Sequence, residues 1–286
     1  MNLRNFLGLA VGLAIAGLAG VAAAQQASTW DQIQATKTLR VGCAASEPWC
    51  FKDLSDSVAP GGVKSNNITW RGVSVALGKS IADAMGVKLE IVETSWGNAV
   101  AGLQANQFDV MFILDATPER KEAIDFVGPV LWYPVALLAN NDFAPKTWDE
   151  MNDPKYSFGA PNGTNFADIL RERVPKAQSM LFQQSSEVVA AFQAGRIIGY
   201  LTTAPNADVA RSKLGRGMTL VPTPRIGLST DGGIRKESDQ RWHTYLQEQV
   251  TKFYNDGVTQ KAYEQFLAFR GLDPTTATSI RKEDWK

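Results

Sequence analysis

Histidine is almost absent from this sequence, which has only His243 in 286 residues. A Ser-His-Asp triad needs a histidine beside a serine and an acid, and most zinc sites use several histidines or cysteines. His243 lies in the polar, helix-like stretch 238–252, which is typical of a solvated surface side chain. Triad hydrolysis and zinc chemistry therefore explain this protein poorly, and we predict no metal and no cofactor.

The sequence also lacks a charge imbalance and, beyond its first residues, a long apolar run. It has 29 basic and 29 acidic residues, so no net charge draws it to nucleic acid or to an anionic membrane. Hydrophobic residues make up 44% of the chain and charged residues 20%, as in an ordinary globular protein. The length allows one large domain or two medium ones.

The one long apolar run lies near the N-terminus, from Phe6 to Val21. Arg4 precedes it, and three alanines at 22–24 follow it. We predict a signal peptide over residues 1–24, cleaved after Ala24, and an exported mature protein. A membrane anchor is the alternative, because the run approaches spanning length. The small residues at its end and the polar sequence beyond favour cleavage.

Cysteine is nearly as rare, since Cys43 and Cys50 are the only two. In an exported protein they meet an oxidising compartment, so we predict a disulfide that closes a short loop. Two buried free thiols are the alternative. The spacing C-x6-C is neither a zinc signature nor a redox signature, which argues against catalysis by these sulfurs.

Apolar periodicity indicates strands and helices in alternation, which predicts a parallel sheet covered by helices. The pattern then repeats, because Ala99–Phe112 is similar to Val188–Leu201. Each copy reads as a helix, a turn after Q-A, and a buried strand that runs into a Thr/Pro loop. The elements expected in the first unit are strands at Thr38–Cys43, Val87–Glu93 and Phe108–Leu114, and helices at Val73–Met85 and Asn98–Asn106.

Two extended segments, Leu131–Ala139 and Leu220–Leu228, flank the second unit. If both cross between the units, the chain from Ser229 onward returns to the first one with helices at Ser238–Tyr254 and Val258–Arg270. We therefore expect two α/β lobes joined by two hinge crossings. Ligands of open α/β sheets bind beyond the carboxyl ends of the strands, so the cleft between the lobes is the expected site.

Several motifs then resemble one known family. They are T-L-R-V-G (38–42), G-V-K-L-E-I-V-E-T-S-W (86–96), G-L-Q-A-N-Q-F-D-V (102–110) and T-P-E-R-K-E-A-I-D-F (117–126) in the first unit, with P-N-G-T (161–164), A-G-R (194–196) and A-P-N (204–206) in the second. Together they resemble the periplasmic amino-acid-binding proteins of ABC importers, the family 3 extracellular solute-binding proteins. The resemblance covers nearly all of 38–271. It implies a type II periplasmic-binding-protein fold.

The resemblance assigns ligand contacts to both lobes. In the family the arginine of T-x-E-R holds the ligand carboxylate, which implies Arg120 here and suits a planar guanidinium. The alternative is a surface arginine paired with Glu122 or a neighbour. The strand end aims Asp115 and Thr117 into the same cleft. From the other lobe, the helix start at Asn162, Gly163 and Thr164 is expected to meet the carboxylate with its N–H groups. The alternative is that Thr164 or Asn165 only caps the helix.

Aromatic residues are expected to cover the ligand. Trp96 occupies a position where the family often places a stacking side chain. Trp49 aligns with a second aromatic wall, for which core packing is the alternative.

Two positions depart from the family pattern. Thr203 stands where the family places an acid that receives the α-amino group, and a hydroxyl cannot balance a buried ammonium. Asp115 stands where the family has Thr or Ser. Asp115 either replaces the missing acid or pairs with Arg120, in which case the ligand lacks an α-amine. The stretch Asp53–Ile68 is expected to be a polar loop insertion.

The resemblance implies a monomeric, non-enzymatic periplasmic protein that binds a small carboxylate or zwitterion and serves an ABC permease of the inner membrane. We expect lobe 1 over 25–134, lobe 2 over 135–224 and the return to lobe 1 over 225–286. One alternative is an exported enzyme similar to cyclohexadienyl dehydratases, for which Asp115 and Glu47 are the candidate acid/base groups. Another is a periplasmic receptor or partner subunit.

Overall fold

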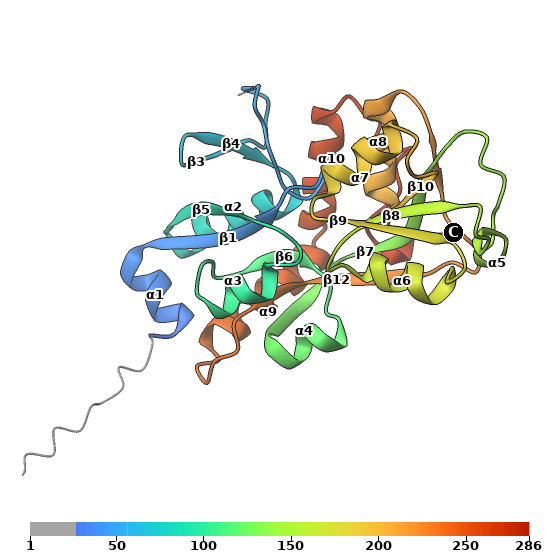
Figure 1. Ribbon diagram of the computed structural model, residues 1–286. Helices are drawn as coiled ribbons and strands as arrows, with labels where there is room; N and C mark the ends of the chain where they lie inside the picture. The colour runs from blue at the N-terminus through green and yellow to red at the C-terminus, as the bar shows by residue number, and fades with distance from the viewer. Residues whose placement is uncertain (1–26, 56, 286) are drawn as a thin grey trace, which may run out of the picture.

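The computed structural model describes residues 27–55 and 57–285 (Figure 1). The predicted signal peptide, residues 1–24, lies outside the described residues. No helix within the described ranges has the length and apolar character needed to cross a membrane. The chain forms two lobes side by side, which share one seven-stranded sheet and are each covered by helices of their own (Figure 1). The expected two-lobed α/β architecture is confirmed.

The first lobe begins with a parallel strand pair joined through a helix. Strand β1 (Thr38–Ala44) pairs with β5 (Lys88–Thr94), and α2 (Val73–Met85) precedes β5. Helix α2 ends at Gly86, whose φ of 65° is the left-handed conformation that glycine adopts without a steric penalty. The predicted strand and helix bounds agree with these to within one residue.

The remaining elements of this lobe surround that pair. Strand β6 begins later than predicted, since only a single bridge from Val41 to Val110 precedes Met111. The stretch Asp53–Ile68 is not only a loop, because it contains β3 and leads into β4 of a small three-stranded sheet. The elements are α1 (Thr29–Thr36), β2 (Phe51–Lys52), β3 (Val63–Ser65), β4 (Ile68–Arg71), α3 (Ala99–Gln104), β6 (Met111–Leu114) and α4 (Pro118–Ala123).

A single long strand, β7 (Asp125–Ala139), joins the two lobes. Its first part pairs with β12 (Gly227–Ile234), and its last residues pair with β10 (Gly199–Thr203) and β11 (Met218–Leu220). The sheet order is β6-β12-β7-β10-β8-β9, with β11 also on β7. The segment expected as the first crossing therefore lies within β7, and the second runs from β11 to β12.

The second lobe repeats the strand–helix alternation of the first. Helix α7 leads into β10 as α3 leads toward β6, which matches the repeat seen in the sequence. The other elements are α5 (Trp148–Met151), β8 (Ser157–Pro161), α6 (Asn165–Arg173), β9 (Gln178–Phe182), α7 (Ser185–Gln193) and α8 (Ala204–Leu214).

The C-terminal part packs on the first lobe, and its tail also reaches the second. Helix α9 (Arg241–Asn255) contacts β7, and α10 (Val258–Phe269) contacts α2. Beyond them, the main-chain oxygen of Ile280 accepts a hydrogen bond from the amide of Trp132 at 2.9 Å. The Thr278 hydroxyl donates to Asp208 on α8 at 2.9 Å. This tail, which includes a 3-10 turn (Lys282–Asp284), is a third connection between the lobes that the sequence did not predict.

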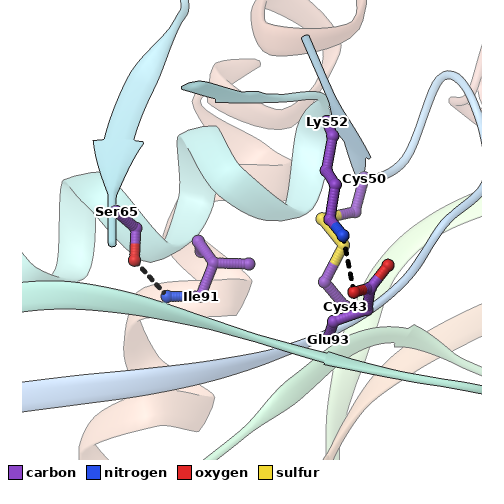
Figure 2. Close-up of a disulfide and its surroundings, with 6 residues drawn as sticks. All are labelled: Cys43, Cys50, Lys52, Ser65, Ile91 and Glu93. Atoms are coloured by element: carbon purple, nitrogen blue, oxygen red, sulfur yellow. Dashed lines mark hydrogen bonds and ion pairs between the residues drawn. A yellow bond between two sulfur atoms is a disulfide. The ribbon is translucent and has the colours of Figure 1, made fainter. Parts of the chain in front are cut away.

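A disulfide joins Cys43 of β1 to Cys50 just before β2, as predicted (Figure 2). Nearby, the Lys52 ammonium pairs with Glu93 of β5 at 2.6 Å. The bridge closes a loop of residues 44–49. This loop faces the second lobe, because Ser46 and Glu47 both contact Asn206.

Candidate ligand-binding site

A cavity lies between the two lobes, beyond the ends of β1, β6 and β10. It leaves about 30 Å³ for the centre of a water molecule, which is room for roughly two waters. Its walls are Ser46, Trp49, Trp96, Ile113, Asp115, Arg120 and Tyr133 on one side, and Pro161, Thr164, Phe166, Ser185, Tyr200, Thr202, Thr203 and Asn206 on the other. Six of the nine predicted ligand contacts line this cavity, and the other three line an adjoining opening.

Arg120 lies in the first turn of α4 and is 8% exposed. Thr117 caps the helix by accepting a hydrogen bond from the Arg120 amide at 3.2 Å, which fixes the backbone that carries the arginine. The guanidinium donates to the main-chain oxygens of Asp115 at 2.9 Å and Gly163 at 2.5 Å. It donates to the oxygen of Trp96 at 3.3 Å as well. Burial lowers the Arg120 pKa, and the negative charge of Asp115 opposes this shift. Because the guanidinium donates only to neutral main-chain oxygens among the described residues, an anionic ligand can take the place of one of these acceptors.

Asp115 lies directly after β6 and is partly buried. Its Oδ1 accepts a hydrogen bond from the Tyr133 hydroxyl at 2.9 Å. Burial raises the pKa of Asp115, against the opposing effects of the Tyr133 hydrogen bond and the Arg120 charge. Burial and the neighbouring Asp115 charge raise the pKa of Tyr133 well above its usual value. Arg120 contacts the main chain of Asp115 and not its carboxylate.

The backbone just before Asp115 is unusual. Ile113, which lines the cavity, has φ 60°, a conformation that β-branched residues rarely adopt. The paired strand β12 has an irregular register between Asp231 and Gly232 at the same level. Sequence reasoning missed Asp231. Burial and the charge of Asp115 raise its pKa to about 6, and only Lys121 acts in the opposite direction.

The start of α6 brings the second lobe to Arg120. Thr164 lines the cavity, and its hydroxyl donates to the Pro161 oxygen at 2.7 Å. Asn162 and Gly163 are exposed and line, with Thr117, an adjoining opening on the other side of Arg120. A Cβ on Gly163 would lie 2.9 Å from the Cα of Gly97 in the first lobe. Glycine therefore permits the close approach of the two lobes here.

The start of α8 contributes Thr203 and Asn206. The Thr203 hydroxyl caps the helix, accepting from the Asn206 amide at 3.1 Å and donating to its side-chain oxygen at 2.5 Å. The Asn206 amide group donates to Ser46 Oγ at 2.8 Å and to the Glu47 main-chain oxygen at 2.6 Å. The sequence offered a signal for Asn206 in the motif A-P-N, but we did not predict it as a site residue.

Both predicted tryptophans line the cavity. Trp49 is 2% exposed, donates to the Asn206 oxygen at 2.6 Å and packs on Tyr263 with ring centroids 6.1 Å apart. It therefore belongs to the core as well as to the cavity wall. Trp96 is partly buried and lies between the cavity and the adjoining opening.

Glu47, one of the two candidate acid/base groups, is held by two cations. Its carboxylate accepts from Arg270 at 2.7 and 2.8 Å, and it pairs with Lys213 of the second lobe at 2.8 Å. Such a doubly paired carboxylate is poorly suited to proton transfer, because removing its charge leaves two cations without their partner.

The comparisons with known proteins identify the family of this chain. The model of the bacterial extracellular solute-binding proteins, family 3, matches residues 54–269. A probable amino-acid ABC transporter-binding protein of Haemophilus influenzae is 30% identical over 128 residues, which are 44% of this chain and 45% of that protein. The match therefore spans less than half of that relative.

Solved structures extend the similarity to most of the chain. An ancestral amino-acid-binding protein, described as a precursor of cyclohexadienyl dehydratase, has a TM-score of 0.71 and 27% identity, covering 84% of this chain and 99% of its own. A substrate-binding protein of Streptococcus pneumoniae bound to L-arginine has a TM-score of 0.73 at 24% identity, covering 89% and 100%. The second match shows the fold alone.

The family match covers most of the chain. The two lobes of this chain and the cavity between them are those of a periplasmic-binding-protein fold of type II. This chain belongs to family 3 of the bacterial extracellular solute-binding proteins.

Proposed function

We propose that this protein captures a small amino acid, or a similar carboxylate, between its lobes and delivers it to an ABC importer of the inner membrane. The observation that carries the proposal is the position of Arg120 between the two lobes. Its buried guanidinium lies at the cavity and donates to main-chain oxygens of both lobes. A ligand carboxylate would replace the neutral Gly163 oxygen with a charged acceptor, and such bonds contribute about 1.5–3 kcal/mol each.

The other predicted contacts take supporting roles in this proposal. Thr117 fixes the helix turn that carries Arg120. Thr164 lines the cavity at the start of α6, where it can contact the ligand carboxylate from the second lobe. Trp96 and Trp49 cover the apolar body of the ligand. The proposed lobes are residues 25–134 with 225–286, and 135–224, with the tail as an added connection. The proposed setting is the periplasm, as a monomer, after removal of residues 1–24.

We propose binding without catalysis. One observation favours the rival reading, a dehydratase-like enzyme, because burial raises the pKa of Asp115 at the cavity. A proton-transferring group needs a second group that completes the transfer, and Glu47 is held by Arg270 and Lys213. A binding protein requires only the charge complementarity that Arg120 and the helix starts supply.

Isothermal titration calorimetry against a panel of amino acids and organic acids tests the proposal. We expect saturable binding of at least one ligand with no slow heat of turnover. The variant Arg120→Met should lose about 3 kcal/mol or more of binding free energy, because the carboxylate loses its charged partner. Arg173→Met, on the exposed face of α6, is the matched control and should bind as the wild type does. Turnover, or full binding by Arg120→Met, would contradict the proposal.

A further inference from the structure

The charges that line the cavity come from one lobe. Asp115 and Arg120 both follow β6 in the first lobe. The second lobe contributes only neutral side chains, which are Pro161, Thr164, Phe166, Ser185, Tyr200, Thr202, Thr203 and Asn206. Among them, the Thr203 hydroxyl donates to the side-chain oxygen of Asn206 and accepts from its main-chain amide.

The carboxylate of Asp115 has a donor but no contacting cation. Tyr133 donates to it, while Arg120 gives its hydrogen bonds to main-chain oxygens. Within the described part of the chain, no lysine or arginine nitrogen lies at salt-bridge distance from it. A partly buried carboxylate without a counter-ion is costly, and a bound ammonium would offset that cost.

The other charges near Asp115 leave the site open to a cation. Asp231, on the paired strand β12, adds a second acidic group, whose pKa is raised by burial and by Asp115 itself. The positive charge of Lys121, on α4, lowers the pKa of Asp231, and that of Arg120 lowers the pKa of Asp115, but in both carboxyls burial outweighs this effect and the pKa is raised. Tyr133 faces Asp115 from β7 with its hydroxyl protonated, since its pKa is raised well above the usual value.

We propose that Asp115 binds the ammonium of a zwitterionic ligand, beside the carboxylate held by Arg120. One lobe then recognises both charged ends of the ligand, and the second lobe closes over it with neutral groups. Tyr133 is a positioning residue that orients the Asp115 carboxylate. This inference rests on the proposed function and narrows its ligand to α-amino acids and similar zwitterions.

Matched ligand pairs that differ only in the amine test the proposal. The probes are L-alanine and propionate, L-phenylalanine and 3-phenylpropionate, L-glutamate and glutarate, and L-arginine and 5-guanidinopentanoate, and the tightest pair is carried forward. The wild type should prefer the amine-bearing member by about 10- to 100-fold, as expected for one charge-assisted hydrogen bond. In Asp115→Asn this preference should be lost, so that the ratio of the two affinities is about one. The deaminated member should bind to this variant as well as to the wild type, or better.

Two further variants separate the roles. Thr203→Ala alters the neutral wall of the second lobe, so it should weaken both members of a pair by similar factors and leave the amine preference intact. Tyr133→Phe removes the hydrogen bond that favours ionised Asp115, so on acidification the preference should disappear at a higher pH than in the wild type. A purely structural tyrosine would leave that pH profile unchanged.

The outcomes also distinguish this inference from the proposed function. Binding of both pair members with equal affinity by the wild type would overturn the inference and leave the proposed function standing. So would equal losses for both members in Asp115→Asn, or loss of the preference in Thr203→Ala. If Asp115→Asn does not fold, Asp115→Ser provides the same comparison. If the wild type binds no ligand of any pair, the proposed function fails and the inference fails with it.

Discussion

Arg120 and Asn206 occupy equivalent places in the two lobes. Each is the third residue after a threonine that caps a helix, and each cap accepts a hydrogen bond from the amide of the polar residue. Each side chain also reaches the other lobe, Arg120 to the Gly163 oxygen and Asn206 to Ser46 and Glu47. The repeat detected in the sequence therefore produces a reciprocal pair of interlobe contacts around the cavity.

Asn206→Ala should favour separation of the lobes. The change removes the hydrogen bonds to Ser46 and Glu47 and leaves the indole N–H of Trp49 without its acceptor. A buried donor left unpaired costs about 1–3 kcal/mol. Small-angle scattering of the ligand-free variant should give a larger radius of gyration than the wild type. Asn255→Ala, at the exposed end of α9 and away from the cavity, is the matched control, and an equal increase there would remove the special role of Asn206.

Ligand should close the cleft in the wild type. The cavity has room for roughly two waters, so a ligand enters only when the lobes move apart, and it shifts the equilibrium by contacting both lobes of the closed form. We expect the radius of gyration to fall when a tight ligand is added. An unchanged radius would indicate a rigid site and contradict a hinge about β7 and the β11–β12 segment.

The disulfide should stabilise the loop that faces Asn206. Thiol titration of unfolded, unreduced protein from the periplasm should find no free sulfhydryl, because Cys43 and Cys50 are joined. Replacing both by serine should lower the free energy of unfolding by about 2.5 kcal/mol in the chain-entropy account of so short a loop. Chemical denaturation measures this loss. Two titratable thiols, or an unchanged denaturation midpoint, would contradict the prediction.

Asp231 should make stability depend on pH in a direction opposite to that of most carboxylates. Its folded pKa is raised to about 6 by burial and by Asp115, so the folded state holds the proton more tightly than the unfolded state. Its stabilising effect is complete at low pH and is lost as the pH rises from about 4 through 6. Asp231→Asn should therefore stabilise the protein at pH 7, by about 1–3 kcal/mol, and have little effect at pH 4. Denaturation curves at the two pH values measure this, and a constant difference would refute it.

Much of this architecture could be predicted from local patterns. Helix α2 was placed correctly because a periodic apolar segment ends at Gly86, which adopts the left-handed conformation that the pattern implies. The lobes were predictable because the helix–strand unit occurs twice. The disulfide could be predicted from two cysteines and the predicted signal peptide.

The parts that were missed depend on contacts between distant segments. Asp231 lies in the Gly-rich strand β12, and its proximity to Asp115 follows from the pairing of β12 with β6. The C-terminal tail has no periodic pattern, so nothing local indicates that Ile280 is buried against β7. Asn206 follows a proline at a helix start, where asparagine is ordinary, and its reach across the cleft depends on how the lobes meet.

The tail has a practical consequence for reporting ligand capture. At the other end of the described chain, the amide of Thr29 donates to Glu237 and so anchors α1 to the first lobe. The tail bonds to both lobes, to Asp208 of α8 through Thr278 and to Tyr254 of α9 through Glu283, so a dye placed after Trp285 would follow neither lobe alone. A donor dye before α1 and an acceptor dye at Arg173, which is exposed on α6 of the second lobe, would instead be carried by bodies that rotate against each other. Their energy transfer would record each capture event optically, with no label in the cleft.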